Sequence, residues 1–325
     1  MKPYRIGVLT SGGDAPGMNA AIRAVVRQSL DLGVDVYGIY RGFQGLVDQD
    51  WRPLSSRNCA NILQRGGTIL NTARCHAFKV KSVRAQAARD LKEAGIDSLV
   101  VIGGDGSFTG AHLLGEEHGI PCAGIPGTID NDLPGTERTL GFDTALNTAI
   151  GAIDKIRDTA SSHERLFLVE VMGRSSGMIA VHTAIACGAE AVLYPESHVD
   201  SYAALVTQLK AGWERGKRSS IVVVAEGDQA GNPYEVGERL RNEYNLDLRV
   251  VVLGHIQRGG SPTAIDRIWG SLWGSEAVKR LVAGEKGFYL GAQANELVSI
   301  PLSRIHDARP EPPLALTKLV PTLAL

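Results

Sequence analysis

The stretch Leu99 to Ser107 reads LVVIGGDGS, and it decides the fold class. Leu99 to Ile102 form an apolar, largely β-branched run, which is typical of a strand buried on both faces of a parallel sheet. The glycines that follow allow a sharp backbone turn, and Asp105 stands in the middle of that turn. A buried strand that runs straight into a glycine-rich turn is typical of doubly wound α/β proteins.

The same alternation of strand and helix patterns extends along the chain. Other short apolar runs predict strands at Ile6 to Thr10, Val34 to Tyr40, Leu166 to Val171, Ile221 to Ala225 and Val250 to Leu253. Apolar spacing near 3.6 predicts helices at Arg84 to Ala94, Thr144 to Ala160, Ala203 to Arg215 and Val236 to Tyr244. We therefore expect an α/β protein with two doubly wound, mainly parallel sheet lobes, because 325 residues exceed what one core usually holds.

The composition excludes several classes of protein. Lys and Arg total 34 against 35 Asp and Glu, so the net charge of -1 gives no general reason to expect nucleic acid or a membrane surface as partner. The four cysteines form no CxxC pair, which fits a reducing, cytoplasmic setting. No apolar stretch approaches the roughly 18 residues that a membrane span needs, so we expect a soluble protein. From Ala308 onward the proline-rich tail predicts irregular structure.

Glycine turns follow four of the predicted strands. They lie at Gly12 and Gly13, Gly103 to Ser107, Gly173 to Gly177, and Gly254 to Gly260. Ligands of such sheets bind beyond the carboxyl ends of the strands, so we expect the four turns to face one crevice. The phosphate-loop pattern GxxxxGK[ST] is missing, and the glycines from Gly104 onward are spaced one residue too widely for the dinucleotide pattern.

Three carboxylates near these turns favour phosphoryl transfer. The reaction needs a cradle for a polyphosphate, an anchor for Mg²⁺ and a base for the attacking hydroxyl. Asp105 suits the metal, because a bare anion site would not place a carboxylate among its glycines. A helix N-cap is the alternative interpretation of Asp105. Loops of the GGDG type also occur in kinases of lipids and of NAD, so this motif indicates a reaction class and no substrate.

The segment Pro126 to Asp132, PGTIDND, carries the other two carboxylates. In an extended loop Asp130 and Asp132 would point the same way, and a neighbour of like charge raises the pKa of one of them. That favours Asp130 as the base and Asp132 as a support for metal and water, with Thr128 bonded to the transferring phosphate. An Asx turn is the alternative.

Several cationic or polar side chains stand at the ends of strands and loops. Arginine matches phosphate geometry, so their number suggests that both substrates carry phosphate, although any one of them alone would be read as a solvated surface residue. They are Arg74, Arg165, Arg174, Glu226, Arg249, His255 and Arg258.

Taken together, five segments resemble the bacterial ATP-dependent 6-phosphofructokinases over residues 3 to about 300. They are TSGGDAPGMNA (Thr10 to Ala20), GGDGS, PGTIDND, EVMGR (Glu170 to Arg174) and GHIQRGGSP (Gly254 to Pro262). The resemblance implies a homotetramer that phosphorylates fructose 6-phosphate with MgATP, the committed step of glycolysis. It implies an ATP lobe of residues 1–140 and 256–306 and a fructose 6-phosphate lobe of residues 141–255 and 307–325, with the active site in the crevice between them.

The resemblance also implies roles for individual residues, with Asp105 on Mg²⁺, Asp130 as base and Arg174 and Thr128 beside it. ATP would be lined by Gly13, Arg74, Cys75, Gly104, Asp105, Gly106 and Ser107. Fructose 6-phosphate would meet Thr128, Ile129, Asp130, Met172, Gly173, Arg174, Glu226, His255, Ile256, Gln257 and Arg258. Arg165 and Arg249 would reach in from a neighbouring subunit. Relatives that use pyrophosphate carry Asp and Lys at the positions of Gly106 and Gly127, so ATP is the expected donor.

An effector site for ADP or phosphoenolpyruvate is also implied, on Arg23, Arg27, Arg157, Glu190, Arg215 and Lys217. The chain departs from the family there, with Ser56 where a basic residue is usual and Arg215 where Lys is common. Two other interpretations stay open. One is a kinase of another phosphorylated sugar, such as tagatose 6-phosphate. The other is a nucleotide sensor without catalysis, for which Asp105, Asp130 and Asp132 would have no use.

Overall fold

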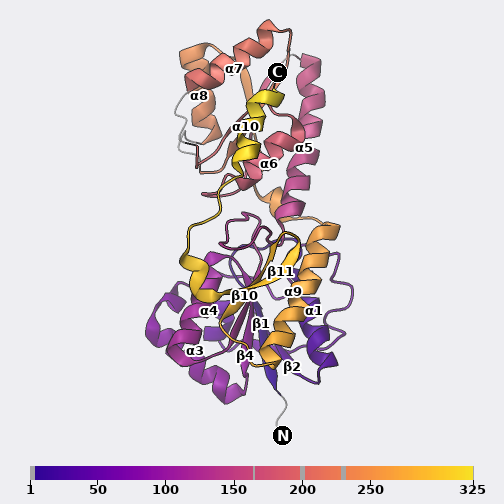
Figure 1. The fold of residues 1–325 in the computed structure, drawn as a ribbon, viewed down its shortest axis with the longest axis vertical. Helices are drawn as coiled ribbons and strands as arrows, with labels where there is room; N and C mark the ends of the chain where they lie inside the picture. Colours follow the sequence, from indigo (N-terminus) through magenta and orange to yellow (C-terminus); the bar gives the residue numbers. More distant parts are fainter. Residues whose placement is uncertain (1–3, 164, 198–201, 228–231, 325) are drawn as a thin grey trace. The chain divides into compact units, whose positions relative to one another are not determined.

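The computed structural model describes residues 4–163, 165–197, 202–227 and 232–324 (Figure 1). The chain forms two compact units. The first comprises residues 1–129, 133–144 and 258–310, and the second comprises residues 130–132, 145–257 and 311–325. The chain therefore passes from one unit to the other after residues 129, 132, 144, 257 and 310. The assignment of ATP to one lobe and of the sugar phosphate to the other stays a prediction.

The first unit is built on a sheet of seven strands. In spatial order they are β11 (Glu296–Pro301), β10 (Phe288–Gln293), β5 (Cys122–Pro126), β4 (Ser98–Gly103), β1 (Arg5–Thr10), β2 (Asp35–Ile39) and β3 (Trp51–Pro53). The five central strands run parallel, and β3 and β11 add antiparallel edges. Every residue of β4 is buried, which explains why its sequence is an unbroken apolar run.

Helices cover both faces of this sheet (Figure 1). On one face lie α1 (Met18–Asp31) and α9 (Ala264–Val282), and on the other lie α2 (Phe43–Val47), η1 (His76–Lys79), α3 (Lys81–Ala94), α4 (Asp105–His118) and η3 (Leu302–His306). The contact between α1 and α9 needs glycine, because a Cβ on Gly274 would lie 2.5 Å from the backbone oxygen of Ala21. Trp273 of α9 is fully buried and donates its indole hydrogen to the carbonyl of Gly291 at 3.2 Å.

The second unit has a smaller, fully parallel sheet. Its order is β7 (Ala191–Leu193), β8 (Ser220–Ala225), β6 (Leu166–Val171) and β9 (Leu248–Val252), and β9 leads into η2 (Gly254–Arg258). Its helices are α5 (Phe142–His163), α6 (Met178–Cys187), α7 (Tyr202–Glu214), α8 (Pro233–Tyr244) and α10 (Leu314–Leu323). Leucines and valines of α7 and α8 form one buried cluster with β6, β8 and β9.

The predicted fold class is confirmed, and each predicted strand and helix is present with ends shifted by a few residues. The four cysteines are free thiols. Among the residues that the structure describes, no helix combines the length and the apolar character of a membrane span.

The prediction of an irregular tail from Ala308 onward holds for residues 308–313 and is wrong beyond them, where α10 begins. Pro313 has a φ of -56° and directly precedes the helix, a place where proline costs no hydrogen bond. The helix packs on α6 and β7 and buries Val320. This tertiary contact outweighs the local effect of the prolines, including Pro321 inside the helix.

Candidate active site

Two of the predicted glycine turns meet in the first unit, at the carboxyl ends of the neighbouring strands β1 and β4. The amide of Ser11 donates to the carbonyl of Ile102 at 2.9 Å. A Cβ on Gly103 would lie 2.5 Å from both the carbonyl oxygen of Ser11 and Oγ of Ser107. Glycine is therefore required here, and the two turns approach closely enough to act as one backbone surface.

Gly13, in the first turn, faces a guanidinium. A Cβ at this position would lie only 2.0 Å from Nη1 of Arg258, and that nitrogen donates to the carbonyl of Asp14 at 3.2 Å. Open backbone beside an arginine, near the start of α4, is the arrangement that proteins use to hold phosphate.

The loop of residues 65–75 is tied to the same place by Asn19 of α1. Asn19 is 1% exposed; its Nδ2 donates to the carbonyls of Arg65 and Gly66, and its Oδ1 accepts from the amide of Ile69 at 2.9 Å. Two predicted residues, Arg74 and Cys75, lie at the end of this loop, the first exposed and the second half-buried. The sequence analysis missed Asn19, although a polar residue among the apolar residues of α1 is a usable signal.

Asp105 is the first residue of α4, and both of its carboxylate oxygens are engaged. Oδ1 accepts from the amide of Gly106 at 2.6 Å, and Oδ2 accepts from Nη2 of Arg309 at 2.6 Å. Beside it Gly106 borders open space, with no atom within 4 Å of a Cβ placed there. Arg309 was also missed, because it lies in the tail that was predicted to be irregular.

The segment around Asp130 is buried and strongly bent. Ile129, Asp130 and Asp132 are all buried, and Asn131 between the two carboxylates has a φ of +50°. The expectation of an extended loop is therefore wrong at Asn131, whose short polar side chain tolerates the left-handed conformation. Asp130 and Asp132 belong to the second unit, where the carbonyl of Asp130 accepts from Oγ of Ser176 at 3.0 Å.

Thr128 lies next to the glycine turns of the first unit. Its Cβ is 3.6 Å from the position that a Cβ on Gly104 would occupy, and its carbonyl accepts from Oγ1 of Thr139 at 2.6 Å. An isolated parallel bridge joins Gly127 to Leu140 nearby. These two contacts join the residues just before Asp130 to Thr139 and Leu140, and so hold together the two ends of the segment that carries Asp130.

The turns after β6 and β8 meet in the second unit. A Cβ on Gly227 would lie 2.4 Å from the carbonyl oxygen of Arg174, and Arg174 itself has a φ of +53°. Its side chain is exposed. Such a backbone conformation is uncommon for a residue other than glycine, and it marks a turn whose shape is imposed by its surroundings.

The η2 segment joins the same group through Gln257, which is fully buried. Its Oε1 accepts from the amide of Met172, next to Gly173, at 2.8 Å. His255 and Ile256 of the same segment are exposed. Of the four predicted residues of this segment, Gln257 fixes a neighbouring turn, His255 and Ile256 are exposed, and Arg258 donates to the carbonyl of Asp14.

Two glutamates are neighbours at this end of the sheet. Burial, and secondarily the charge of Glu226, raise the pKa of Glu170 above its ordinary value. The amide of Glu226 donates to the carbonyl of Val171 at 2.8 Å, which fixes the start of the turn after β8. The predicted residue Glu226 thus stands beside a second acid that the sequence analysis did not consider.

Arg165 and Arg249 lie at the other end of the second sheet. Arg165 directly precedes β6. Arg249 of β9 lies opposite Phe167 of β6 in the sheet, and its Nη1 forms an ion pair with Oδ1 of Asp247 at 2.7 Å. Since β6 rises about 3.3 Å per residue, these arginines are roughly 15 Å or more from the turn that carries Arg174. The structure does not bring them together with the other predicted residues of the unit.

The predicted effector residues fall into two groups. In the second unit Nζ of Lys217 lies 3.1 Å from Oε1 of the buried Glu190, and Arg157 donates to the carbonyls of Cys187 and Gly188 at the end of α6. Arg215 is exposed beside them. In the first unit Arg23 and Arg27 lie one turn apart on α1, and both counteract the burial that raises the pKa of Cys59 to about 11.

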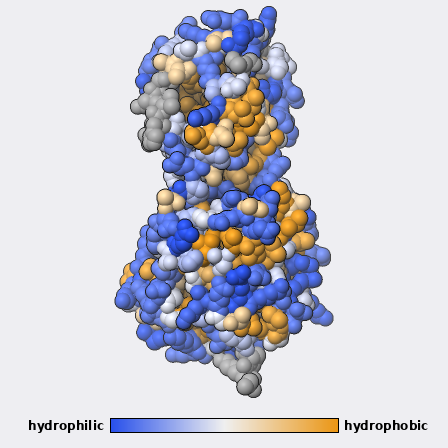
Figure 2. Space-filling view, viewed as in Figure 1, coloured by the Kyte–Doolittle hydropathy of each residue, from blue (hydrophilic) through white to orange (hydrophobic). Residues whose placement is uncertain are grey.

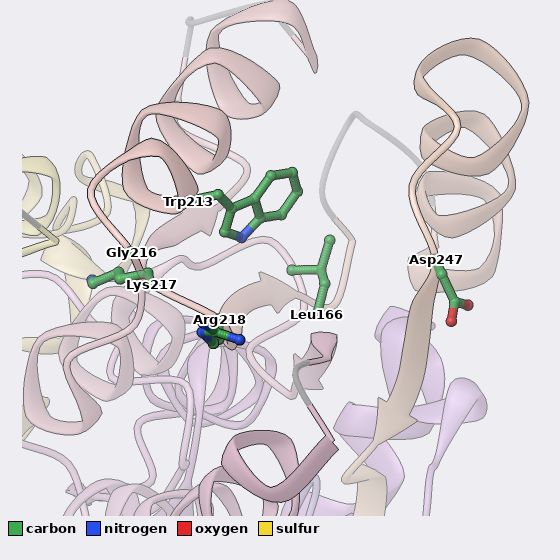
Figure 3. Close-up of a pocket in the computed structure, with 6 residues that line it drawn as sticks. All are labelled: Leu166, Trp213, Gly216, Lys217, Arg218 and Asp247. Atoms are coloured by element: carbon green, nitrogen blue, oxygen red, sulfur yellow. The ribbon is translucent and has the colours of Figure 1, made fainter.

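A pocket of about 400 Å³ lies next to Lys217 (Figure 3). Figure 3 shows the indole of Trp213 pointing into it from α7, while Asp247 borders it from the side of β9. Its lining residues are Leu166, Trp213, Gly216, Lys217, Arg218 and Asp247. Of these, only Lys217 was predicted as a site residue.

Comparison with known proteins places the chain in a family. The sequence profile of phosphofructokinases matches residues 5–281. The ATP-dependent 6-phosphofructokinase 1 of Thermus thermophilus is 54% identical over 321 residues, which cover 99% of both chains. The chain belongs to the phosphofructokinase family. The ATP-dependent 6-phosphofructokinase of Bacillus subtilis is also 54% identical, over 305 residues and 94% of both chains.

Solved phosphofructokinases share the fold. The phosphofructokinase of Saccharomyces cerevisiae superimposes with a TM-score of 0.87 at 36% identity, covering 99% of this chain and 46% of the yeast chain. The pyrophosphate-dependent phosphofructokinase of Marinobacter aquaeolei gives a TM-score of 0.84 at 21% identity, over 96% of this chain and 86% of that one. At 21% identity, the second similarity supports the fold and not the function. The resemblance to the phosphofructokinase family is confirmed, and the roles of single residues stay predictions.

Proposed function

We propose that this phosphofructokinase transfers the γ-phosphoryl group of ATP to the 1-hydroxyl of fructose 6-phosphate, releasing fructose 1,6-bisphosphate and ADP. The observation that carries the proposal is the exposed backbone of Gly13 in contact with Arg258, next to the turn in which Asp105 begins α4. Phosphoryl transfer needs little covalent chemistry from the protein, and such a cradle provides placement and charge neutralisation. The bacterial relatives described above are named for ATP and for this sugar phosphate.

Asp105 fits the role of a Mg²⁺ ligand. It offers a hard oxygen donor, its side chain is 40% exposed, and Oδ2 already attracts a cationic group. In the part of the chain that the structure describes, no three His, Cys, Asp or Glu side chains form a larger metal site. That agrees with a cation held by one carboxylate and by substrate phosphates. When bound, Mg²⁺ would neutralise charge on the phosphates.

Asp130 would accept the proton of the 1-hydroxyl as that oxygen attacks the γ-phosphorus. Asp130 is 4% exposed, so little water competes with the attacking hydroxyl for its carboxylate. Arg174, Glu226 and His255 would bind the sugar phosphate together with Arg258, and Thr128 would hold the transferring group. ATP would lie along the turns that begin at Gly13 and Gly104, with Arg74 and Cys75 beside it.

The structure favours ATP over pyrophosphate at Gly127. A Cβ there would lie 3.0 Å from Cγ2 of Ile102 and 3.1 Å from Cε of Met18, so a lysine would require these side chains to shift, and the glycine brings no positive charge that would neutralise pyrophosphate. Gly106 differs, because it borders open space that an α-phosphate could occupy.

The proposed assembly is a cytoplasmic homotetramer with shared sites. Arg165 and Arg249 stand at the opposite end of their sheet from Arg174, so we assign them to the active site of a neighbouring copy. Figure 2 shows hydrophobic side chains at the surface over α9, where Ile265, Ile268 and Leu272 are exposed. Such a patch suits a contact between copies.

ADP or phosphoenolpyruvate would bind the effector residues. Arg157, Arg215 and Lys217 would provide positive charge in one copy, with Glu190 beside them. Arg23 and Arg27 would come from another copy. This arrangement would couple the occupancy of the effector site to the contact between subunits.

The test is a comparison of donors and acceptors on purified protein with Mg²⁺. Turnover is expected with ATP and fructose 6-phosphate, and little with pyrophosphate. Equal or faster turnover of tagatose 6-phosphate would replace the sugar assignment. Nucleotide binding without any turnover would support the sensor interpretation and overturn the enzyme. ADP and phosphoenolpyruvate, added in turn, test the effector site.

A further inference from the structure

Arg309 holds the carboxylate oxygen of Asp105 that the proposed function assigns to the metal. Its Nη2 lies 2.6 Å from Oδ2, while Oδ1 is occupied by the amide of Gly106. Both residues belong to the first unit. The side chains are 50% and 40% exposed, so the guanidinium faces the same solvent-filled space into which Asp105 projects.

The approach of Arg309 to Asp105 is fixed by the segment before it. Leu302 and Ile305 of η3 are buried in the core cluster of the first unit, and η3 packs along α4 (Figure 1). The rings of His112 on α4 and His306 stack edge to face at 6.3 Å. The segment therefore follows α4 back to its first turn, where Arg309 meets Asp105.

Stability does not explain this ion pair. Exposed pairs contribute little to folding, because solvent screens them and two long side chains lose freedom. Charge balance gives a better reason. The pair is neutral, whereas a polyphosphate at the start of α4 would bring several negative charges to Asp105. An arginine at this place can neutralise such charge with two parallel hydrogen bonds.

We propose that Arg309 is a ligand of the nucleotide's polyphosphate, and that it pairs with Asp105 only while no nucleotide is bound. With the metal nucleotide bound, the guanidinium of Arg309 would move to a phosphate oxygen, and Asp105 would be free to help hold the cation. This inference rests on the proposed function, since it places the nucleotide at this turn.

The exchange has two consequences of opposite sign. Without nucleotide, Arg309 competes with a free divalent cation for Asp105, so its removal should strengthen binding of the bare cation severalfold. With nucleotide, Arg309 adds a charge-assisted contact, so its removal should weaken binding of the metal nucleotide about tenfold. A residue that only supports the fold would not shift the two affinities in opposite directions.

The experiment measures binding, not turnover, on the full chain without sugar phosphate. Mn²⁺ alone is titrated by electron paramagnetic resonance, and a magnesium complex of a non-hydrolysable ATP analogue by calorimetry. Arg309→Ala is compared with Arg309→Lys, which keeps the charge and loses the fork. Arg304→Ala is the control, because Arg304 is an exposed arginine of the same segment, paired with Asp307 at 2.7 Å. Asp105→Asn removes the proposed metal ligand, so the binding heat that this variant loses in calorimetry comes from this site.

The expected result is weaker nucleotide binding and stronger Mn²⁺ binding in Arg309→Ala, a smaller loss in Arg309→Lys, and no change in Arg304→Ala. An unchanged nucleotide affinity in Arg309→Ala would overturn the inference and leave the proposed function standing. So would an equal loss in Arg304→Ala. A wild-type chain that binds no nucleotide would instead defeat the proposed function, and this inference with it.

Discussion

Among single residues, Asp130 allows the most direct test of the chemistry. Asp130→Ser should lower kcat by about 10² to 10⁴, the range for loss of a general base, and leave both KM values nearly unchanged. Steady-state kinetics with ATP and fructose 6-phosphate measure this. Arg304→Ala, at an exposed arginine that is not among the predicted site residues, serves as the control. An undiminished kcat in Asp130→Ser would exclude the role of base.

Gly106 tests the choice of phosphoryl donor. Because a side chain at Gly106 would meet open space, Gly106→Asp should fold normally. Its carboxylate would repel the phosphates of ATP, so the KM for ATP should rise roughly tenfold, which corresponds to about 1.4 kcal/mol. Gly106→Asn is the matched control for size without charge. Equal KM values in the two variants would contradict an electrostatic effect.

From the raised pKa of Glu170 we predict that the stability of the fold depends on pH. Its pKa is raised in the folded chain from the ordinary 4.5, so the unfolded chain releases this proton first as the pH rises. The free energy of unfolding therefore falls as the pH rises from the unfolded-state pKa to the raised folded-state pKa. Below both pKa values Glu170 is protonated in both states and does not lower stability. Glu170→Gln should raise Tm at about pH 8 and leave it nearly unchanged at about pH 4. A gain of the same size at both pH values would contradict the charge as its cause.

At the scale of elements, Asp266 of α9 fixes the start of α5. The buried carboxylate accepts from the amide of Gly141 at 2.9 Å and from the amide and hydroxyl of Thr144. Burial outweighs these bonds and raises the pKa of Asp266. The bonds also lie at the end of the segment that carries Asp130.

Loss of this carboxylate should be costly. Asp266→Ala leaves buried donors without a partner, at about 1 to 3 kcal/mol each, so unfolding free energy should fall by roughly 3 kcal/mol. Urea unfolding followed by circular dichroism measures the change. Asp143→Ala, which removes a less buried acid from the first turn of α5, should cost far less. Equal losses in the two variants would show that helix charge, not burial, matters.

The elements also show what the sequence could and could not predict. Strands such as β4 were predictable because burial on both faces leaves an unbroken apolar run. The glycine turns were predictable because they follow those runs directly. The contact of Gly13 with Arg258 and that of Asp105 with Arg309 join distant segments, and no local pattern encodes such pairs. The tail helix α10 was missed because its support comes from α6 and β7.

At the scale of the whole molecule, Arg165 tests the shared site. Arg165→Ala should raise the concentration of fructose 6-phosphate for half-saturation, by about tenfold for the loss of one charged contact, and leave the KM for ATP unchanged. An unchanged requirement for the sugar phosphate would contradict the assignment.

A mixture of two variants tests whether Arg165 acts in its own copy or in a neighbouring one. Chains with Arg165→Ala and chains with Asp130→Ser, unfolded and refolded together, should be more active than either variant alone at a low concentration of fructose 6-phosphate, because some sites would combine an intact Asp130 with an intact Arg165. If Arg165 acted within its own copy, no mixed site would be complete.

The contact between α1 and α9 bears on how the chain matures during synthesis. α1 is synthesised long before the helix against which it packs, Ala264–Val282. Until α9 is made, this face of the large sheet is covered by α1 without its partner helix. All four strands of the small sheet lie within residues 166–252, so this sheet can form before α9 has been synthesised. A nascent chain therefore keeps part of this apolar face available to chaperones until α9 has been synthesised.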